Sequence, residues 1–171
     1  MTEPRLDPAG FYELDLSRGT VHTRAGDRVV VLTDHVARAL LREPSVLRDL
    51  GEAMGAEAAR HLGDAPSATP ERALAEGTAA LGVFGWGRLG LERWGDALVA
   101  TLDEAPTESR EALAALLTGF FSRLTGRAVE CVPSGDGKYV MVHPAIAATV
   151  RSWAAGGAEV PAIVGRLRRP A

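Results

Sequence analysis

The chain has 171 residues and 46% hydrophobic content, enough for one buried core but too little for two. A net charge of −3, with basic residues clustered only in the final RLRRP, argues against a nucleic-acid-binding surface. No apolar run reaches the ~18 residues of a membrane span, and the single cysteine cannot form an intrachain disulfide. The first residues, MTEPRLDPAGFYELDL, do not have the charged-then-apolar order of a secretory signal. We therefore expect a cytoplasmic protein with one domain in residues 1–157, a tail in residues 158–171 and no integral membrane segment.

The first part of the chain has the period of β-strands. FYELDL and TVHTR alternate in hydrophobicity and flank a turn signal at residues 17–19, which predicts a hairpin. The β-branched run RVVVLT, residues 28–33, is a candidate third strand. From Asp34 the apolar spacing becomes helical, and Pro44 ends this short helix.

A second helix is predicted from Ser45, whose hydroxyl can cap it. Its inward stripe consists of Leu47, Leu50, Met54, Ala58 and Leu62. Gly51 and Gly55 lie one turn apart on this helix, and each costs roughly 1 kcal/mol relative to alanine. Two glycines in register therefore predict close approach of another backbone, and we place a dimer interface here. A loosely specified surface helix is the alternative.

A third helix begins at Thr69, where a capping hydroxyl is followed by Pro70 and Glu71. It ends in glycines, and two strand-like runs follow, RLGLERW and DALVATL, separated by Gly95. These signals predict a helix that leads directly into a pair of strands.

The clearest helix runs from Thr107 to Thr125 and is stopped by Gly126. Its apolar face consists of Leu113, Leu116, Leu117, Phe120, Phe121 and Leu124. AVECVP and KYVMVH then flank a glycine-rich turn and predict a second hairpin. Pro144 begins a final helix, which glycines end at 156–157.

FGWGRLG contains a G-x-G-x-x-G string, formed by Gly85, Gly87 and Gly90. A dinucleotide fingerprint requires a strand, the glycines and then a helix, because the pyrophosphate rests on the amides of that helix. Here a helix precedes the glycines and a strand-like segment follows them. We therefore expect no nucleotide binding at this string.

The order of elements resembles the small domain shared by bacterial 4-vinyl-reductase-type sensor domains and subunits of the TRAPP vesicle-tethering particle. The resemblance covers residues 19–143 and rests on four segments: RVVVLT before a leucine-rich helix, LRDLGEAMGAEAARHLG, LGVFGWGRLGLERW, and LLTGFFSRLTGRAVECVPSGDGKYVMV. The last segment is the most specific, since in that family a helix containing Gly-Phe leads into a hairpin with an E-x-x-C strand and a Gly-Asp turn.

The resemblance implies an α+β fold in which helices cover one side of an antiparallel sheet, a homodimer formed through the helical side, and in some relatives an apolar ligand pocket. Metal-binding relatives place several cysteines around the metal. Cys131 matches the first of these, but Lys138, Tyr139 and Val140 stand where the next is sought. We therefore expect no metal and no cofactor.

No catalytic constellation is evident in the sequence. The four histidines, His22, His35, His61 and His143, belong to unrelated elements, and no G-x-S-x-G accompanies them. We expect a protein that is not an enzyme, although spacing alone leaves haem ligation by His61 or His35 open. We interpret Cys131 as a small core residue, with an acyl acceptor or a redox sensor as the alternative.

Large apolar residues from several elements are candidates for a hydrophobic pocket, which they would either line or fill: Met54, Phe84, Trp86, Leu91, Phe120 and Phe121. Phe120 and Phe121 project about 100° apart on a helix, so one can enter the core while the other faces a partner. The interface candidates are Gly51, Gly55 and Phe121. Two functions follow: a dimeric sensor or scaffold that binds a partner protein, such as a signalling component or a small GTPase, or a receptor for a hydrophobic small molecule or acyl chain.

Overall fold

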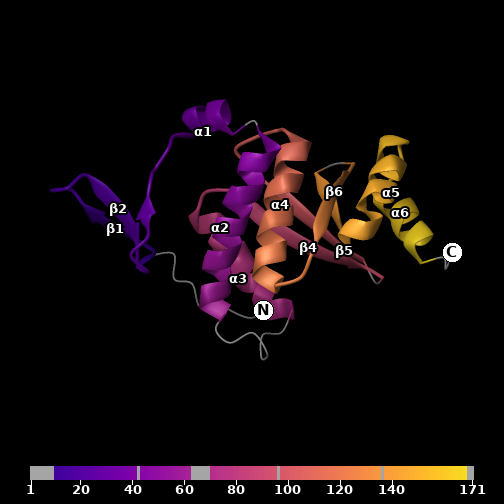
Figure 1. Ribbon diagram of the computed structural model, residues 1–171, viewed down its shortest axis with the longest axis horizontal. Helices are drawn as coiled ribbons and strands as arrows, with labels where there is room; N and C mark the ends of the chain where they lie inside the picture. The colour runs from indigo at the N-terminus through magenta and orange to yellow at the C-terminus, as the bar shows by residue number, and fades with distance from the viewer. Residues whose placement is uncertain (1–9, 42, 63–69, 96, 136, 169–171) are drawn as a thin grey trace.

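The computed structural model describes residues 10–41, 43–62, 70–95, 97–135 and 137–168. In this part of the chain, two antiparallel sheets and six helices form an α+β fold, as the sequence predicts (Figure 1). The strands are β1 (Tyr12–Asp15), β2 (Thr20–Thr23), β3 (Arg28–Val29), β4 (Arg88–Trp94), β5 (Ala97–Asp103), β6 (Glu130–Ser134) and β7 (Lys138–Val142). The helices are α1 (Asp34–Leu40), α2 (Pro44–Leu62), α3 (Pro70–Val83), α4 (Arg110–Thr125), α5 (Pro144–Ala155) and α6 (Val160–Leu167).

The main sheet has the strand order β4-β5-β7-β6, and every neighbouring pair is antiparallel. It consists of the two predicted pairs, β4 with β5 and β6 with β7, joined side by side through β5 and β7. Val99 is opposite Val140, which in turn is opposite Val132, so these three valines share one face of the sheet. This register brings residues from both hairpins into a common core.

Helices α3 and α4 pack on the other face of this sheet, and α2 packs against these two helices (Figure 1). Helix α4 begins where the Ser109 hydroxyl accepts a hydrogen bond from the Ala112 amide at 3.3 Å. It ends at Gly126, whose φ of 64° is the left-handed conformation that glycine adopts without strain. All six residues of its predicted apolar face are buried, because α4 lies between α2 and the sheet. Helix α2 begins at Pro44, one residue before the predicted cap.

A second apolar cluster covers the valine face of the sheet. It joins Val99, Val132 and Val140 to residues of α5 and α6, including Val150 and Ile163. The sheet is therefore packed on both faces, whereas the sequence placed helices on one. The physical reason is visible in β5, where neighbouring residues on opposite faces are both apolar and both buried.

Helix α6 lies in the segment that the sequence describes as a tail. Val160, Ile163 and Val164 have the spacing of one helical face, and all three are buried in the second cluster. Residues 158–168 thus contain a packed helix of eight residues.

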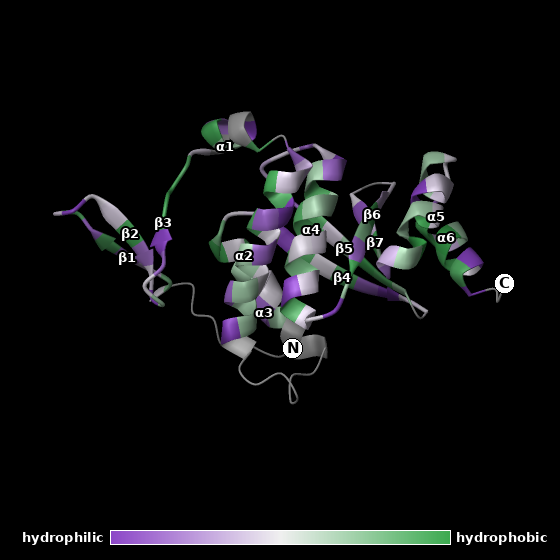
Figure 2. Cartoon of the chain, in the orientation of Figure 1, coloured by the Kyte–Doolittle hydropathy of each residue, from purple (hydrophilic) through white to green (hydrophobic). Residues whose placement is uncertain are grey.

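The small sheet of β1, β2 and β3 projects from the rest of the molecule (Figure 1). At its base, Phe11 is buried in the main core and the Tyr12 hydroxyl donates to the carbonyl oxygen of Val83 at 2.7 Å. Only Arg28 and Val29 of the predicted third strand pair with β2. The apolar residues that follow form the green segment between β3 and α1 in Figure 2.

The glycine string connects a helix to a strand, in the predicted order. Helix α3 ends at Val83, and β4 begins at Arg88. Gly85 and Gly87 have φ values of 74° and 93°, so both adopt a conformation that side chains disfavour. They reverse the chain between α3 and β4, and the order required for a dinucleotide turn is not met.

Candidate functional site

The six pocket candidates belong to one apolar cluster, which is formed by the helices and the main sheet. Met54, Trp86, Phe120 and Phe121 are buried, whereas Phe84 and Leu91 are partly buried against the same cluster. They come from α2, the α3–β4 connection, β4 and α4, elements separated by up to 67 positions in the sequence. The fold thus brings together residues that the sequence identifies only one at a time.

Aromatic rings pack edge to face at this site. The ring centroids of Phe120 and Phe121 are 5.4 Å apart, and those of Phe84 and Phe11 are 5.5 Å apart. Phe11 and Tyr12, which pack here from the N-terminal end, were not among the sequence candidates. Their signal is weak because the hydrophobic alternation of the first strand does not distinguish Phe11 from its neighbours.

The three interface candidates have contacts within their own chain. A Cβ on Gly51 would lie 2.9 Å from the carbonyl carbon of Leu116, and one on Gly55 would lie 3.1 Å from that of Phe120. The backbone that approaches these glycines is therefore α4 of the same molecule. Phe121 is 2% exposed. The homodimer itself stays a prediction, but these three side-chain positions are already occupied in one chain.

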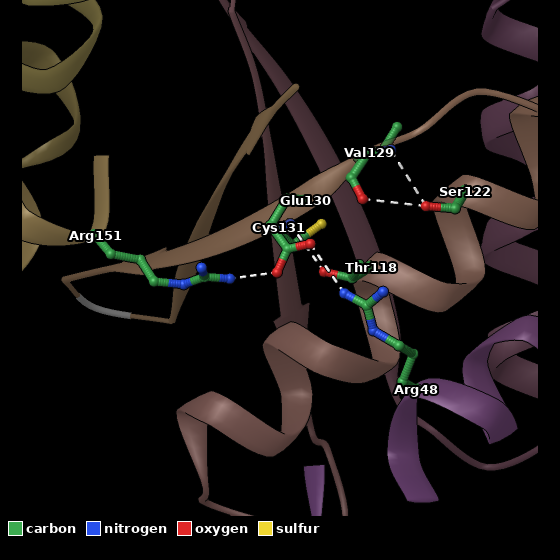
Figure 3. A network of polar contacts seen from close by, with 7 residues as sticks. All are labelled: Arg48, Thr118, Ser122, Val129, Glu130, Cys131 and Arg151. Atoms are coloured by element: carbon green, nitrogen blue, oxygen red, sulfur yellow. Dashed lines mark hydrogen bonds and ion pairs between the residues drawn. The ribbon is translucent and has the colours of Figure 1, made fainter. Parts of the chain in front are cut away.

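Cys131 lies at the edge of the core, on β6. Its amide donates to the Thr118 hydroxyl at 2.9 Å, which ties the strand to α4 (Figure 3). Burial raises the pKa of the thiol to about 12, and a side-chain interaction of the thiol with Thr118, distinct from the amide bond, offsets only part of that rise. At neutral pH the sulfur is therefore a protonated thiol and a poor nucleophile or metal ligand.

A metal site or a histidine-based site would require particular arrangements of the described residues. No group of three or more His, Cys, Asp or Glu side chains among them could hold a metal ion. His143 accepts a hydrogen bond from the Ala145 amide at 3.2 Å and so caps α5. His22 and His35 lie on β2 and α1, while the side chain of His61 lies outside the described part of the molecule.

A polar network lies beside Cys131 (Figure 3). The Glu130 carboxylate binds Arg48 of α2, at 2.9 Å, and also Arg151 of α5. Its side chain is 16% exposed, so both guanidiniums pair with a largely buried charge. One carboxylate thus connects helices on opposite faces of the sheet. No local sequence signal pointed to this network, because its members are up to 103 positions apart.

A cleft of about 270 Å³ opens at this network. It is lined by Pro44, Ser45, Arg48, Glu111, Ala114, Ala115, Glu130, Cys131 and Arg151. A second cavity, of about 240 Å³, lies between α6 and the β4–β5 turn. None of the six pocket candidates lines either one.

Known proteins resemble this chain in structure but not in sequence. No family model matches the sequence, and no curated protein matches it either. The structure is similar to the crystal structure of the phenol-responsive sensory domain of the transcription activator PoxR with phenol. The TM-score is 0.57 at 11% identity, over 78% of this chain and 84% of that one. The likeness shows a shared fold. This chain and that sensory domain therefore have the same overall fold. Among the described residues, no helix is long and apolar enough to cross a membrane.

Proposed function

We propose that this chain is a non-catalytic sensory domain that binds a small hydrophobic molecule. The observation that supports this most is its likeness to a phenol-responsive sensory domain over most of both chains. The aromatic cluster adds chemical support, since apolar and aromatic side chains predominate in small-molecule sites. The described histidines lie on separate elements and the thiol is protonated, which supports a role without catalysis.

We also propose that the chain is related to the group of 4-vinyl-reductase-type sensor domains and TRAPP subunits. In support, a helix containing Gly119 and Phe120 leads into a hairpin that starts at Glu130, which is the most specific part of the sequence resemblance. A relationship of this kind implies an apolar ligand pocket in some members, and the aromatic cluster is the candidate for it here.

The ligand would enter beside Phe84 and Leu91. These two are the partly buried members of the candidate cluster: Phe84 lies in the α3–β4 connection, and Leu91 lies on β4. Deeper members such as Met54 and Phe120 are buried and would form the inner wall. A compact apolar molecule, with at most one polar group, fits such a wall.

Native mass spectrometry of the purified protein tests this function, together with thermal unfolding in the presence of phenol. A bound molecule should add mass, and phenol should raise the midpoint by mass action, because it binds only the folded state. Leu91→Trp fills the entrance and should abolish both effects. Ile146→Trp is the matched control, since Ile146 is exposed on α5. The proposal fails if neither effect occurs, or if Leu91→Trp leaves both unchanged.

A second function, a scaffold built on self-association, is favoured by the N-terminal part of the chain. Large apolar side chains are exposed there: Leu14, Leu16, Val30, Val31, Leu32 and Val36. Exposed apolar patches of this kind mark interaction surfaces. A sensory domain of this type would then act as a dimer, and a partner protein would bind the assembled pair.

A further inference from the structure

The cavity between α6 and the β4–β5 turn has the composition of a binding groove. It has a volume of about 240 Å³ and is lined by Trp94, Gly95, Pro161, Val164, Gly165 and Arg168. These residues give it an indole, aliphatic walls and one cationic group. The groove is separate from the aromatic cluster, because α6 packs on the opposite face of the main sheet.

Trp94 is fixed as one wall of this groove. Its indole Nε1 donates to the Glu92 carboxylate at 2.7 Å, and the Lys138 ammonium lies 5.1 Å from the ring centroid. Lys138 is not among the groove residues, so the ring is held from outside the groove. A ligand that meets this ring would find it already oriented, which lowers the entropy lost on binding.

Gly165 leaves the groove open. It lies inside α6, where glycine costs roughly 1 kcal/mol relative to alanine. No described atom lies within 4 Å of a Cβ built on it, in contrast to Gly51, so close packing does not explain this glycine. Because Gly165 lines the groove, a large side chain at this position would take up free space in it.

Arg168 supplies the groove with a cation. Among the described residues, no hydrogen bond or ion pair involves its guanidinium, whereas the neighbouring Arg166 stacks at 5.4 Å over Trp153. Arg168 passes over Gly95, and a Cβ there would lie 2.7 Å from its Nε. A cation at a helix C-terminus is favourable by itself. That effect explains its charge but not its place in an apolar groove.

We propose that this groove binds a small aromatic monocarboxylate. The ring of the ligand would stack on Trp94 and contact Val164, and the carboxylate would pair with the Arg168 fork. A single guanidinium with apolar walls suits one negative charge better than a dianion. The volume suits a molecule of about ten non-hydrogen atoms, below the roughly 300 Å³ at which drug-sized pockets begin.

The test titrates the protein with benzoate and, separately, with uncharged benzyl alcohol. Binding is detected by NMR as a shift of the Trp94 indole N–H signal, which is assigned as the signal that disappears in Trp94→Phe. Benzoate should shift this signal and bind at least tenfold more tightly than benzyl alcohol. Gly165→Leu fills the groove while favouring the helix, and Arg168→Ala removes the cation. Each should weaken benzoate binding at least tenfold. Arg166→Ala is the matched control and should bind like the wild type.

The proposal is overturned if millimolar benzoate leaves the Trp94 signal unmoved, or if neither Gly165→Leu nor Arg168→Ala weakens binding. Equal affinity for benzyl alcohol would also overturn it, since the carboxylate would then have no role. The result does not depend on the proposed sensory function. Binding of phenol in the aromatic cluster should survive Gly165→Leu, and benzoate binding should survive Leu91→Trp.

Discussion

Three glycines determine how closely α2 and α4 pack. Gly51 and Gly55 on α2 meet the backbone of α4, and Gly119 on α4 meets that of α2, where a Cβ would lie 2.9 Å from the Glu52 amide nitrogen. The atom nearest to each of these Cβ positions belongs to the backbone of the other helix, so a side chain at any of the three cannot be accommodated by a rotamer change. The glycines offset their helix-propensity cost by permitting this approach.

Gly51→Ala should therefore destabilise the isolated chain. A single methyl group forces the two helices apart, and overpacking of this kind costs about 1–3 kcal/mol. Gly82→Ala is the matched control, because Gly82 is also helical but has no described atom within 4 Å of its Cβ position. It should leave stability unchanged or raise it by up to about 1 kcal/mol. Urea unfolding of both variants measures the difference, and equal midpoints would contradict the account.

The buried Cys131 thiol should make the free energy of unfolding depend on pH in the alkaline range. Its folded pKa is about 12, against an ordinary value of 9.0, because burial penalises the thiolate. Above pH 9 the unfolded chain releases this proton while the folded chain retains it. The free energy of unfolding should then fall as the pH rises from 9 towards 12. Tyr139, whose pKa burial raises from 10.0 to about 12, acts in the same direction.

Cys131→Ala should reduce this alkaline slope. Denaturant unfolding between pH 8 and 10.5 compares the variant with the wild type, and Cys131→Ala should lose less stability over the interval. Tyr139 retains its own contribution in both proteins, so some slope should persist. Parallel pH profiles for the two proteins would show that the thiol ionises as freely in the folded chain as in the unfolded one.

At the scale of elements, local signals predicted more than distant ones. The hairpin of β6 and β7 and helix α4 follow from turn residues, caps and periodicity, all of which operate within a few positions. The partner of Gly51 was not predictable in this way. The sequence indicates that some backbone comes close, but α4 of the same chain and a helix of a second chain satisfy that requirement equally.

The candidate sites also differ in how far the sequence predicts them. Apolar residues of the aromatic cluster could be nominated one by one, since large apolar side chains seek the core wherever they occur. The Glu130 network and the α6 groove could not, because each depends on how α5 and α6 pack against the sheet. A glycine and two prolines in the last fourteen residues hid the apolar face of α6.

Glu130 holds two helices on the two faces of the sheet, so Glu130→Gln should weaken both attachments. The two arginines are about half exposed, which limits each ion pair, and we expect a total loss of about 1–2 kcal/mol. A double-mutant cycle measures the coupling: Arg48→Gln should cost less in the Glu130→Gln background than in the wild type. Arg93→Gln, at an exposed residue, is the control. Additive effects of the Arg48 and Glu130 changes would show that no coupling exists.

At the scale of the whole molecule, exposed apolar residues are unevenly distributed. Most of the large ones lie before α2, on and just after β1, on the segment after β3 and on α1, and these parts project from the body (Figure 2). Val30 and Val31, at 73% exposure each, follow a strand that pairs over only two residues. This segment has the composition of a strand but lies outside both sheets in the described part of the chain. An exposed edge of this kind invites pairing with another chain.

We therefore expect the homodimer to form through this N-terminal segment. Two copies could extend β3 by pairing residues 30–32 across a twofold axis, which would bury the exposed valines and satisfy free backbone groups at once.

Val31→Glu should weaken the dimer, because it places a charge in a dry interface. Ile146→Glu, at an exposed site on α5, should leave association unchanged. Sedimentation equilibrium at tens of micromolar decides between the outcomes. A monomeric wild type excludes the dimer, and a dimer that withstands Val31→Glu excludes this interface. A substitution at Gly55 would not test this interface, because a side chain there would meet the α4 backbone of the same chain.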